Sequence, residues 1–329
     1  MDSNLTSSNY LSLVEDQLTY SLIIPLILGV IGNCFCCVIF RQKQFRSNAI
    51  STFFTAGSIT NIIVLIYGIG INLDSVDHRS LDQYSLIFCQ VRLYIRHTLL
   101  MIVRSYFVLA CIASFSLSSS RMELRSLFRP KFVQWCIFLV PLIWPLIALH
   151  MPFFTIIREN RCIYVDSYMF ISGIYFFFVV GIFPVLLMTL FILLTVKNLN
   201  SLHRRIQPSI VTPIRLKSRD QHFIRMLSSL VLMYITTNIF YPTNVLYLAM
   251  TNFSTKSEHR IAIESLIFFL TSNYILYINS VSPFFLFFWS STAFRRSFYT
   301  IVDKHKQHLL GTRFRRRRAS TSGALTGCN

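Results

Sequence analysis

The sequence predicts an all-α membrane protein, a seven-transmembrane helix bundle with a short amphipathic helix after the seventh span. Of its 329 residues, 53% are hydrophobic and 13% are charged, which is too apolar for a soluble globule of this size. Basic residues also gather in alternate loops. A spanning helix needs about 20 mostly apolar residues, and seven runs reach that length: 18–40, 50–73, 89–116, 132–150, 168–196, 223–250 and 261–288.

The net charge of +18 is sorted by side of the predicted bundle. Of the 31 Lys and Arg residues, 23 fall in four segments that alternate with segments holding few: 41–46, 121–131, 197–225 and 295–318. An excess of basic residues marks the cytoplasmic loops of a membrane protein. The pattern therefore predicts a multi-pass plasma-membrane protein with an extracellular N-terminus. It attributes the positive charge to topology rather than to nucleic-acid binding.

The chain divides into four predicted segments. Residues 1–17 contain no Lys or Arg, so they lack the basic region of a cleaved signal peptide. We expect them to form an extracellular N-terminus before a seven-transmembrane domain at 18–288. Apolar and basic residues then alternate at helical spacing, which predicts an amphipathic helix at 289–300. Residues 301–329 predict a disordered, basic cytoplasmic tail that is attracted to anionic lipid.

Two sequons and two cysteines fall on segments that the charge pattern places outside. Asn4 and Asn252 each begin an N-x-S/T sequence and are candidate glycosylation sites. Cys89 and Cys162 lie where an oxidising compartment allows a disulfide between them. That bond would join the third span to the loop 153–166, which we expect to fold as a short hairpin over the outer mouth. No residue spacing indicates a metal, another cofactor or an enzyme's catalytic group.

Four ionisable side chains lie inside the third apolar run: Arg92, Arg96, His97 and Arg104. An ionisable residue at bilayer depth is costly and usually faces the bundle interior or a water-filled cavity. A polar third helix therefore indicates a receptor or a transporter. Because no acidic residue lies at the depth of Arg104 in any run, we expect its guanidinium to bond backbone carbonyls or internal water.

Small residues and prolines shape the other runs. The Gly-Asn pair at 32–33 lies in an apolar stretch, and Asn61 ends a patch of small residues. Both features indicate close helix packing. Pro184 and Pro242 each remove a backbone hydrogen bond and kink their helices. We expect hinges at these two prolines and at Pro283.

The ordered helices, the pair at 32–33, the two outer cysteines and the prolines at 184 and 242 together resemble the rhodopsin-like (class A) G-protein-coupled receptors. The resemblance extends from about residue 18 to 300. It is closest to divergent invertebrate peptide receptors, judged by LACI at 109–112, LTVKN at 194–198 and YINS at 277–280. It implies ligand-gated signalling to a heterotrimeric G protein, with arrestin as a further partner.

Several activation motifs of that family are altered here. The acidic-Arg-aromatic triplet, which faces the G protein, falls at Ala113, Ser114 and Phe115, so only the aromatic residue remains. The acidic residue of the second helix corresponds to Asn61, and the segment 282–286 lacks the family's tyrosine. These departures keep a second interpretation open, a receptor fold that binds ligand without activating G proteins, as a scavenger or an arrestin-biased protein. A transporter or channel is a third.

The resemblance implies that a ligand enters between the outer halves of the third, fifth, sixth and seventh helices. Arg96 lies two turns inside Cys89, a depth at which the family places ligand partners, and Arg92 lies one turn above it on the same face. We expect a pocket for an acidic or carbonyl-rich extracellular ligand, a short peptide, lined by Arg92, Arg96, Phe240, Asn244, Tyr247, Asn273 and Tyr277. Alternatively, the two arginines pair with acids such as Asp82, Glu159 or Glu264.

Overall fold

The structure is a computed structural model that describes residues 17–77, 85–158, 161–205, 213–304 and 306–307. These residues contain seven helices that are long and apolar enough to cross a membrane: Gln17–Phe40, Ala49–Asp74, Leu86–Ser118, Pro130–Phe153, Asp166–Ser201, Gln221–Met250 and Glu258–Val281. We number them spans one to seven. The predicted all-α seven-helix bundle is confirmed, and the chain has the architecture of a multi-pass membrane protein.

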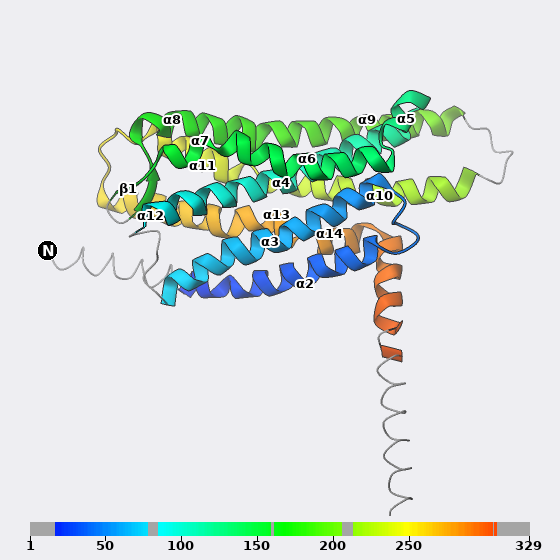
Figure 1. Cartoon of the computed structure of the whole chain (residues 1–329), viewed down its shortest axis with the longest axis horizontal. Helices are drawn as coiled ribbons and strands as arrows, with labels where there is room; N and C mark the ends of the chain where they lie inside the picture. The colour runs from blue at the N-terminus through cyan, green and yellow to red at the C-terminus, as the bar shows by residue number, and fades with distance from the viewer. Residues whose placement is uncertain (1–16, 78–84, 159–160, 206–212, 305, 308–329) are drawn as a thin grey trace, which may run out of the picture.

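The helical elements follow one another along the bundle (Figure 1). Spans one to three are α2 (Ile23–Phe40), α3 (Ala49–Asp77) and α4 (Leu86–Ser118). Helix α5 (Met122–Leu127) precedes span four, which consists of α6 (Pro130–Ala148) and α7 (His150–Phe153). Span five consists of α8 (Asp166–Tyr175), the π-helix η2 (Phe176–Ile182) and α9 (Phe183–Arg205). Span six consists of α10 (Pro213–Thr237) and α11 (Phe240–Met250). Span seven consists of α12 (Glu258–Leu270), the π-helix η3 (Thr271–Ile275) and α13 (Leu276–Val281), and α14 (Pro283–Ser290) follows it.

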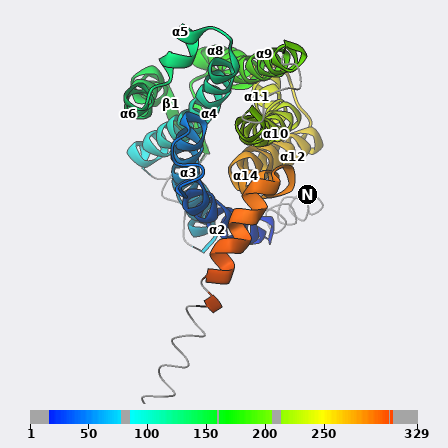
Figure 2. The same ribbon diagram turned by 90° about the vertical axis from the view of Figure 1, so that its right-hand side faces the viewer.

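Helix α4 lies at the centre of the packing, and α6 lies outside it (Figure 2). Helix α4 packs against α3, α6 and α9, and buried residues recur along it from Cys89 to Ser116. Helix α6 instead exposes Trp135, Phe138 and Leu146. Lipid tails are as apolar as leucine, so such faces are stable against lipid. The bundle therefore has apolar outer faces around a polar central helix.

The two ends of the bundle differ in charge. The hairpin of β1 (Thr155–Arg158) and β2 (Arg161–Tyr164) lies at one end, and α5 lies at the other (Figure 1). We call these the disulfide end and the basic end. The connections at the basic end carry Arg41, Lys43, Arg46, Arg121, Arg125, Arg129 and Lys131.

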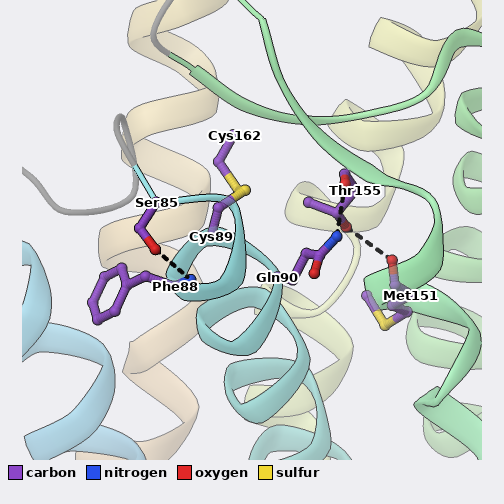
Figure 3. The surroundings of a disulfide bond; sticks show 7 residues. All are labelled: Ser85, Phe88, Cys89, Gln90, Met151, Thr155 and Cys162. Carbon is purple, nitrogen blue, oxygen red and sulfur yellow. Dashed lines mark hydrogen bonds between the residues drawn. A yellow bond between two sulfur atoms is a disulfide. The ribbon is translucent and has the colours of Figure 1, made fainter.

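The hairpin is fixed to the start of α4 (Figure 3). Cys162 is bonded to Cys89 with the two Cα atoms 5.8 Å apart, and the two strands pair antiparallel. The predicted disulfide and hairpin are therefore confirmed. Gln90 Nε2 donates to the Thr155 carbonyl at 3.3 Å, and the Thr155 hydroxyl donates to the Met151 carbonyl at 2.8 Å. The segment after span four is thus held against the disulfide end of α4.

Three helix discontinuities coincide with prolines. Pro184 follows the end of η2, Pro242 lies in the first turn of α11 after a break at residues 238–239, and Pro283 opens α14. Proline lacks the N–H that continues a helix, and π-helical turns are frequent at functional sites. The three residues predicted as hinges therefore lie at interruptions of the helical hydrogen-bond ladder.

Small residues and buried amides bring spans one, two and seven together. Asn33 Nδ2 donates to the Ser280 carbonyl at 2.9 Å, and Asn61 Nδ2 donates to Asn33 Oδ1 at 3.4 Å. A Cβ atom on Gly32 would lie 2.9 Å from the Cβ of Phe284. Interhelical hydrogen bonds and small residues are the usual means of helix association in lipid. The packing role expected for the pair at 32–33 and for Asn61 is confirmed.

A further helix, at residues 292–304, leaves the bundle at the basic end (Figure 1). Its Phe294 is fully buried and contacts the rings of Phe40 and Phe287. Arg296 and Tyr299 on its other face are exposed. This helix is the amphipathic helix predicted after the seventh span.

Two glycines of α3 allow a matched test of the packing between spans two and seven. A Cβ atom on Gly68 would overlap the ring of Tyr277 in α13, whereas a Cβ atom on Gly70 would have no atom within 4 Å. Gly68→Ala should lower the thermal unfolding temperature of the purified chain, because overpacking costs about 1–3 kcal/mol. Gly70→Ala should leave it unchanged or raise it slightly, because alanine favours a helix over glycine by roughly 0.5–1 kcal/mol. Equal effects of the two variants would contradict this packing.

Candidate functional site

A cavity of about 590 Å³ opens at the disulfide end. This volume is within the range of sites for small ligands, roughly 300–1,000 Å³. Much of its wall is apolar, with Phe176 from span five and Phe268 from span seven as examples. Polar and charged side chains interrupt this wall: Asn72, Arg92, Arg96, His97, Arg104, Tyr164, Tyr241, Glu264 and Asn273.

Arg96 projects from α4 into the wall of the cavity. Tyr164, Tyr241 and Tyr277 are titratable neighbours of its guanidinium. Among the residues that the structure describes, no carboxylate forms an ion pair with it. An arginine side chain remains protonated in proteins. The cavity wall therefore contains a full positive charge whose close neighbours are neutral.

Tyr277 supports Arg96 from deeper in the bundle. It is 1% exposed, and its ring occupies the space that Gly68 leaves open. Its hydroxyl approaches Arg96 but makes no well-aligned hydrogen bond within the described part of the chain. Tyr277, predicted as a ligand contact, is therefore a neighbour of Arg96 and not part of the cavity wall.

Arg92 lies one turn nearer the disulfide end and belongs to a hydrogen-bonded relay. Arg92 Nη2 donates to Asn72 Oδ1 at 2.6 Å, and Asn72 Nδ2 donates to Asn273 Oδ1 at 2.7 Å. The relay joins spans three, two and seven along the cavity wall. Two of the predicted ligand residues, Arg92 and Asn273, are thus brought together, through an asparagine that the prediction did not include.

Glu264 is the single carboxylate on the cavity wall among the described residues. Lys256 Nζ lies 2.6 Å from its Oε2, and Arg260 Nε lies 2.9 Å from its Oε1. The Tyr247 hydroxyl also donates to Oε1 at 3.0 Å. Because two cations surround one carboxylate, this part of the cavity mouth has a net positive charge.

The ion pairs of Glu264 test one part of the alternative in which Arg92 and Arg96 pair with acidic residues. Glu264 binds Lys256 and Arg260, so its expected pairing with Arg92 or Arg96 is wrong. The other two acids in that alternative, Asp82 and Glu159, lie outside the described residues.

Span six presents a different face to the cavity from the one predicted. Phe240 is half exposed on the outside of the bundle, so the expectation that it lines the pocket is wrong. Asn244 and Tyr247 turn toward span seven, where Asn244 Nδ2 donates to Thr271 Oγ1 at 3.1 Å. None of these three side chains forms the cavity wall that the structure describes.

The neighbouring face of span six lines the cavity instead. Tyr241, Val245 and Leu248 form this part of the wall. The helix is interrupted at residues 238–239, immediately before this face begins. The rotation of α11 is therefore set by the geometry of the break, which hydrophobic periodicity does not report.

The hairpin supplies a site residue that the sequence analysis did not identify. Tyr164 of β2 reaches the cavity beside Arg96 and Tyr241. Burial raises the pKa of the Tyr164 hydroxyl, so this group stays neutral and can donate a hydrogen bond at physiological pH. The disulfide at Cys162, two residues earlier, fixes its position. Proximity to a predicted disulfide was the one signal that could have identified it.

Arg104 lies at the floor of the cavity and is 3% exposed. Its Nη1 donates to the carbonyl of Val180 in η2 at 3.0 Å. The expectation that it bonds a backbone carbonyl is confirmed. The two arginines therefore differ, because Arg104 donates to a backbone carbonyl, whereas the Tyr277 hydroxyl near Arg96 makes no well-aligned hydrogen bond among the described residues.

The altered triplet lies toward the basic end of α4. Ala113 and Ser114 are buried in the bundle, and the Phe115 ring lies 5.7 Å from that of Phe191 in α9. The resemblance assigns contact with a G protein to this triplet. Positions 113 and 114 offer neither a charged side chain nor an exposed residue for that contact.

Of the two predicted glycosylation sites, Asn252 lies away from the cavity wall. Asn252 is outside the spans at the disulfide end, where its Nδ2 donates to Asp166 Oδ1 at 3.1 Å. Asn4 lies outside the described residues. Within the described part of the chain, no three His, Cys, Asp or Glu side chains are grouped as a metal site requires.

Comparison with known proteins adds no family assignment. No protein-family model matches the chain, and no curated protein sequence matches it. The function is therefore argued from the geometry and charge of the cavity.

Proposed function

We propose that the chain is a ligand-gated receptor of the plasma membrane that signals to heterotrimeric G proteins. Its ligand site is the cavity at the disulfide end, and its ligand is a short peptide that presents an acidic group. In this proposal the disulfide end is extracellular and the basic end is cytoplasmic. Two features support that orientation, the basic connections at one end and the disulfide at the other.

The positive charge of Arg96 is the observation that carries the proposal. Arg96 is partly exposed to the cavity, and a charge held away from bulk water is costly unless a counter-charge or hydrogen bonds compensate it. Among the described residues no carboxylate pairs with Arg96, because Glu264, the one carboxylate on the described cavity wall, is bound to Lys256 and Arg260. A ligand carboxylate would supply the missing counter-charge, and a guanidinium binds a carboxylate through two parallel hydrogen bonds.

The remaining cavity wall fits the rest of such a ligand. Phe176, Val245 and Phe268 offer apolar surface, and Tyr164 and Tyr241 offer hydroxyl groups beside Arg96. A ligand pocket of this kind is mostly apolar with a few polar groups that fix orientation. The cavity volume of about 590 Å³ suits the end of a peptide rather than a folded protein.

Signalling would require the ligand to favour one arrangement of the helices over another. A ligand shifts such an equilibrium only through its difference in affinity for the two arrangements. Tyr241 lines the cavity one residue before Pro242, and Val180 lines it four residues before Pro184. We propose Pro184, Pro242 and Pro283 as the hinges about which the basic ends of spans five, six and seven move.

A second candidate function is favoured by Ala113 and Ser114. These buried, uncharged residues replace the arginine-centred triplet through which the receptors that the chain resembles contact G proteins. A protein with the same cavity could bind its ligand without activating a G protein, as a scavenger or an arrestin-biased receptor. In either case we propose that helix 292–304 and the basic tail contact anionic lipid.

Arg96→Gln should weaken ligand binding by roughly 10- to 100-fold, because a hydrogen bond to a charged group contributes about 1.5–3 kcal/mol. Arg96→Lys should have an intermediate effect, since lysine keeps the charge but loses the two-pronged geometry. The measurement is equilibrium binding of a peptide selected on the unaltered chain, to the purified variants in lipid nanodiscs.

The matched control is Arg121→Gln, which removes one positive charge at the basic end, outside the seven spans. The affinity of the Arg121→Gln variant for the peptide should equal that of the unaltered chain. Unchanged affinity in Arg96→Gln would remove Arg96 from the ligand site.

G-protein dissociation in cells tests the signalling step. The unaltered chain and the double variant Ala113→Asp with Ser114→Arg are compared under a library of short peptides, with surface expression measured for both because positions 113 and 114 are buried. We expect a peptide response from the unaltered chain. A response from the double variant alone would establish the second candidate function in place of the first.

A further inference from the structure

The carbonyl of Val180 joins three spans. Val180 lies in the π-helix η2, and Pro184, four residues later, has no N–H to donate to its carbonyl as an α-helix would. Arg104 Nη1 from span three and Asn238 Nδ2 from span six donate to it at 3.0 and 3.1 Å. Neighbouring helices commonly satisfy backbone groups that proline frees in a membrane helix. Here both of the added donors are side chains from other spans.

The donor from span six comes from the break in that span. Asn238 lies between α10 and α11, is 4% exposed, and donates also to the Gly181 carbonyl at 2.8 Å. A Cβ atom on Gly181 would lie 3.1 Å from two ring atoms of Pro242. The interruptions of spans five and six are therefore in direct contact, with Arg104 bound to the same backbone segment.

The same break is connected to span seven. The hydroxyl of Thr237, the last residue of α10, donates to Asn279 Oδ1 of α13 at 2.8 Å. Movement of α10 about the break would therefore change contacts with spans three, five and seven together.

Placing the charge of Arg104 inside the bundle costs more free energy than a neutral donor to the Val180 carbonyl would. A charged side chain at bilayer depth is costly, and the rare examples usually mark functional positions. Arg104 also forms part of the cavity floor. Its surroundings therefore depend both on what the cavity holds and on how spans five and six are packed.

We infer that Arg104, Val180 and Asn238 form a clamp that holds the interruptions of spans five and six together. Loss of the bond between Arg104 and the Val180 carbonyl loosens both interruptions and leaves spans one and two intact. Arg104 is thus a positioning residue that acts through the backbone of η2 and through Asn238. In the proposed receptor this clamp would couple the cavity to the basic end, but its existence does not depend on that function.

Hydrogen–deuterium exchange of the full chain in nanodiscs, without ligand, tests the clamp. Arg104→Met should speed exchange about tenfold in peptides covering 176–186 and 234–242, since a lost hydrogen bond to a charged group changes a local opening equilibrium by about that factor. Peptides covering 50–70 should keep their exchange rates. Arg104→Lys, which retains a charged donor, should restore most of the protection.

Arg121→Met is the control, because it removes a positive charge at the basic end, outside the seven spans, at a residue that does not bond Val180. Its peptides at 176–186 and 234–242 should exchange like those of the unaltered chain. If Arg104→Met does not fold, Asn238→Leu gives the second test, with faster exchange at the same two segments and a smaller change than in Arg104→Met. Unchanged exchange there in the folded variants, or a uniform increase that includes 50–70, would overturn the clamp.

Discussion

The need to compensate positive charge inside an apolar bundle governs the interior of this protein. Three arginines of α4 lie on the wall or floor of one cavity, and each meets that need differently. Arg104 donates to the Val180 carbonyl, which receives no α-helical bond from Pro184, and Arg92 donates to Asn72. Arg96 has Tyr164, Tyr241 and Tyr277 as titratable neighbours and no carboxylate partner among the described residues. A charge in a low-dielectric site attracts an incoming anion more strongly than it would in water, so we propose that ligand binding in the cavity depends on Arg96.

The same constraint explains where the helices are irregular. The interruptions near Pro184, at residues 238–239 and near Pro283 release backbone groups, and side chains such as Asn238 satisfy them inside the bundle. Outside the bundle, where no partner exists for a polar group, α6 shows apolar surface with Trp135 and Leu146. Side-chain hydrogen bonds between spans thus lie at these interruptions inside the bundle, whereas the exposed face of α6 is apolar. A bundle of this kind can be stable while it retains hinges.

Sequence alone was sufficient for the features that depend on composition and local pattern. The seven spans, the bond between Cys89 and Cys162, the hairpin and the amphipathic helix were all predicted from apolar run length, cysteine position and helical spacing. The cavity wall was predicted only in part. Arg92, Arg96 and Asn273 line it, but Phe240 faces outward and Tyr241 takes its place, because the break at 238–239 sets the rotation of α11. Such rotations, and the register that brings a hairpin residue to a site, depend on tertiary contacts that hydrophobic periodicity does not encode.

Thermal unfolding of two matched variants, without ligand, tests the central claim most directly. If Arg96 is an uncompensated cation and Arg104 a satisfied one, Arg96→Met should raise the unfolding temperature of the purified chain, because apolar replacement of a poorly compensated buried charge is often stabilising. Arg104→Met should lower it, because the replacement removes a hydrogen bond to the carbonyl of Val180. A decrease of similar size in both variants would show that the protein already compensates Arg96, and would contradict an anion-binding cavity.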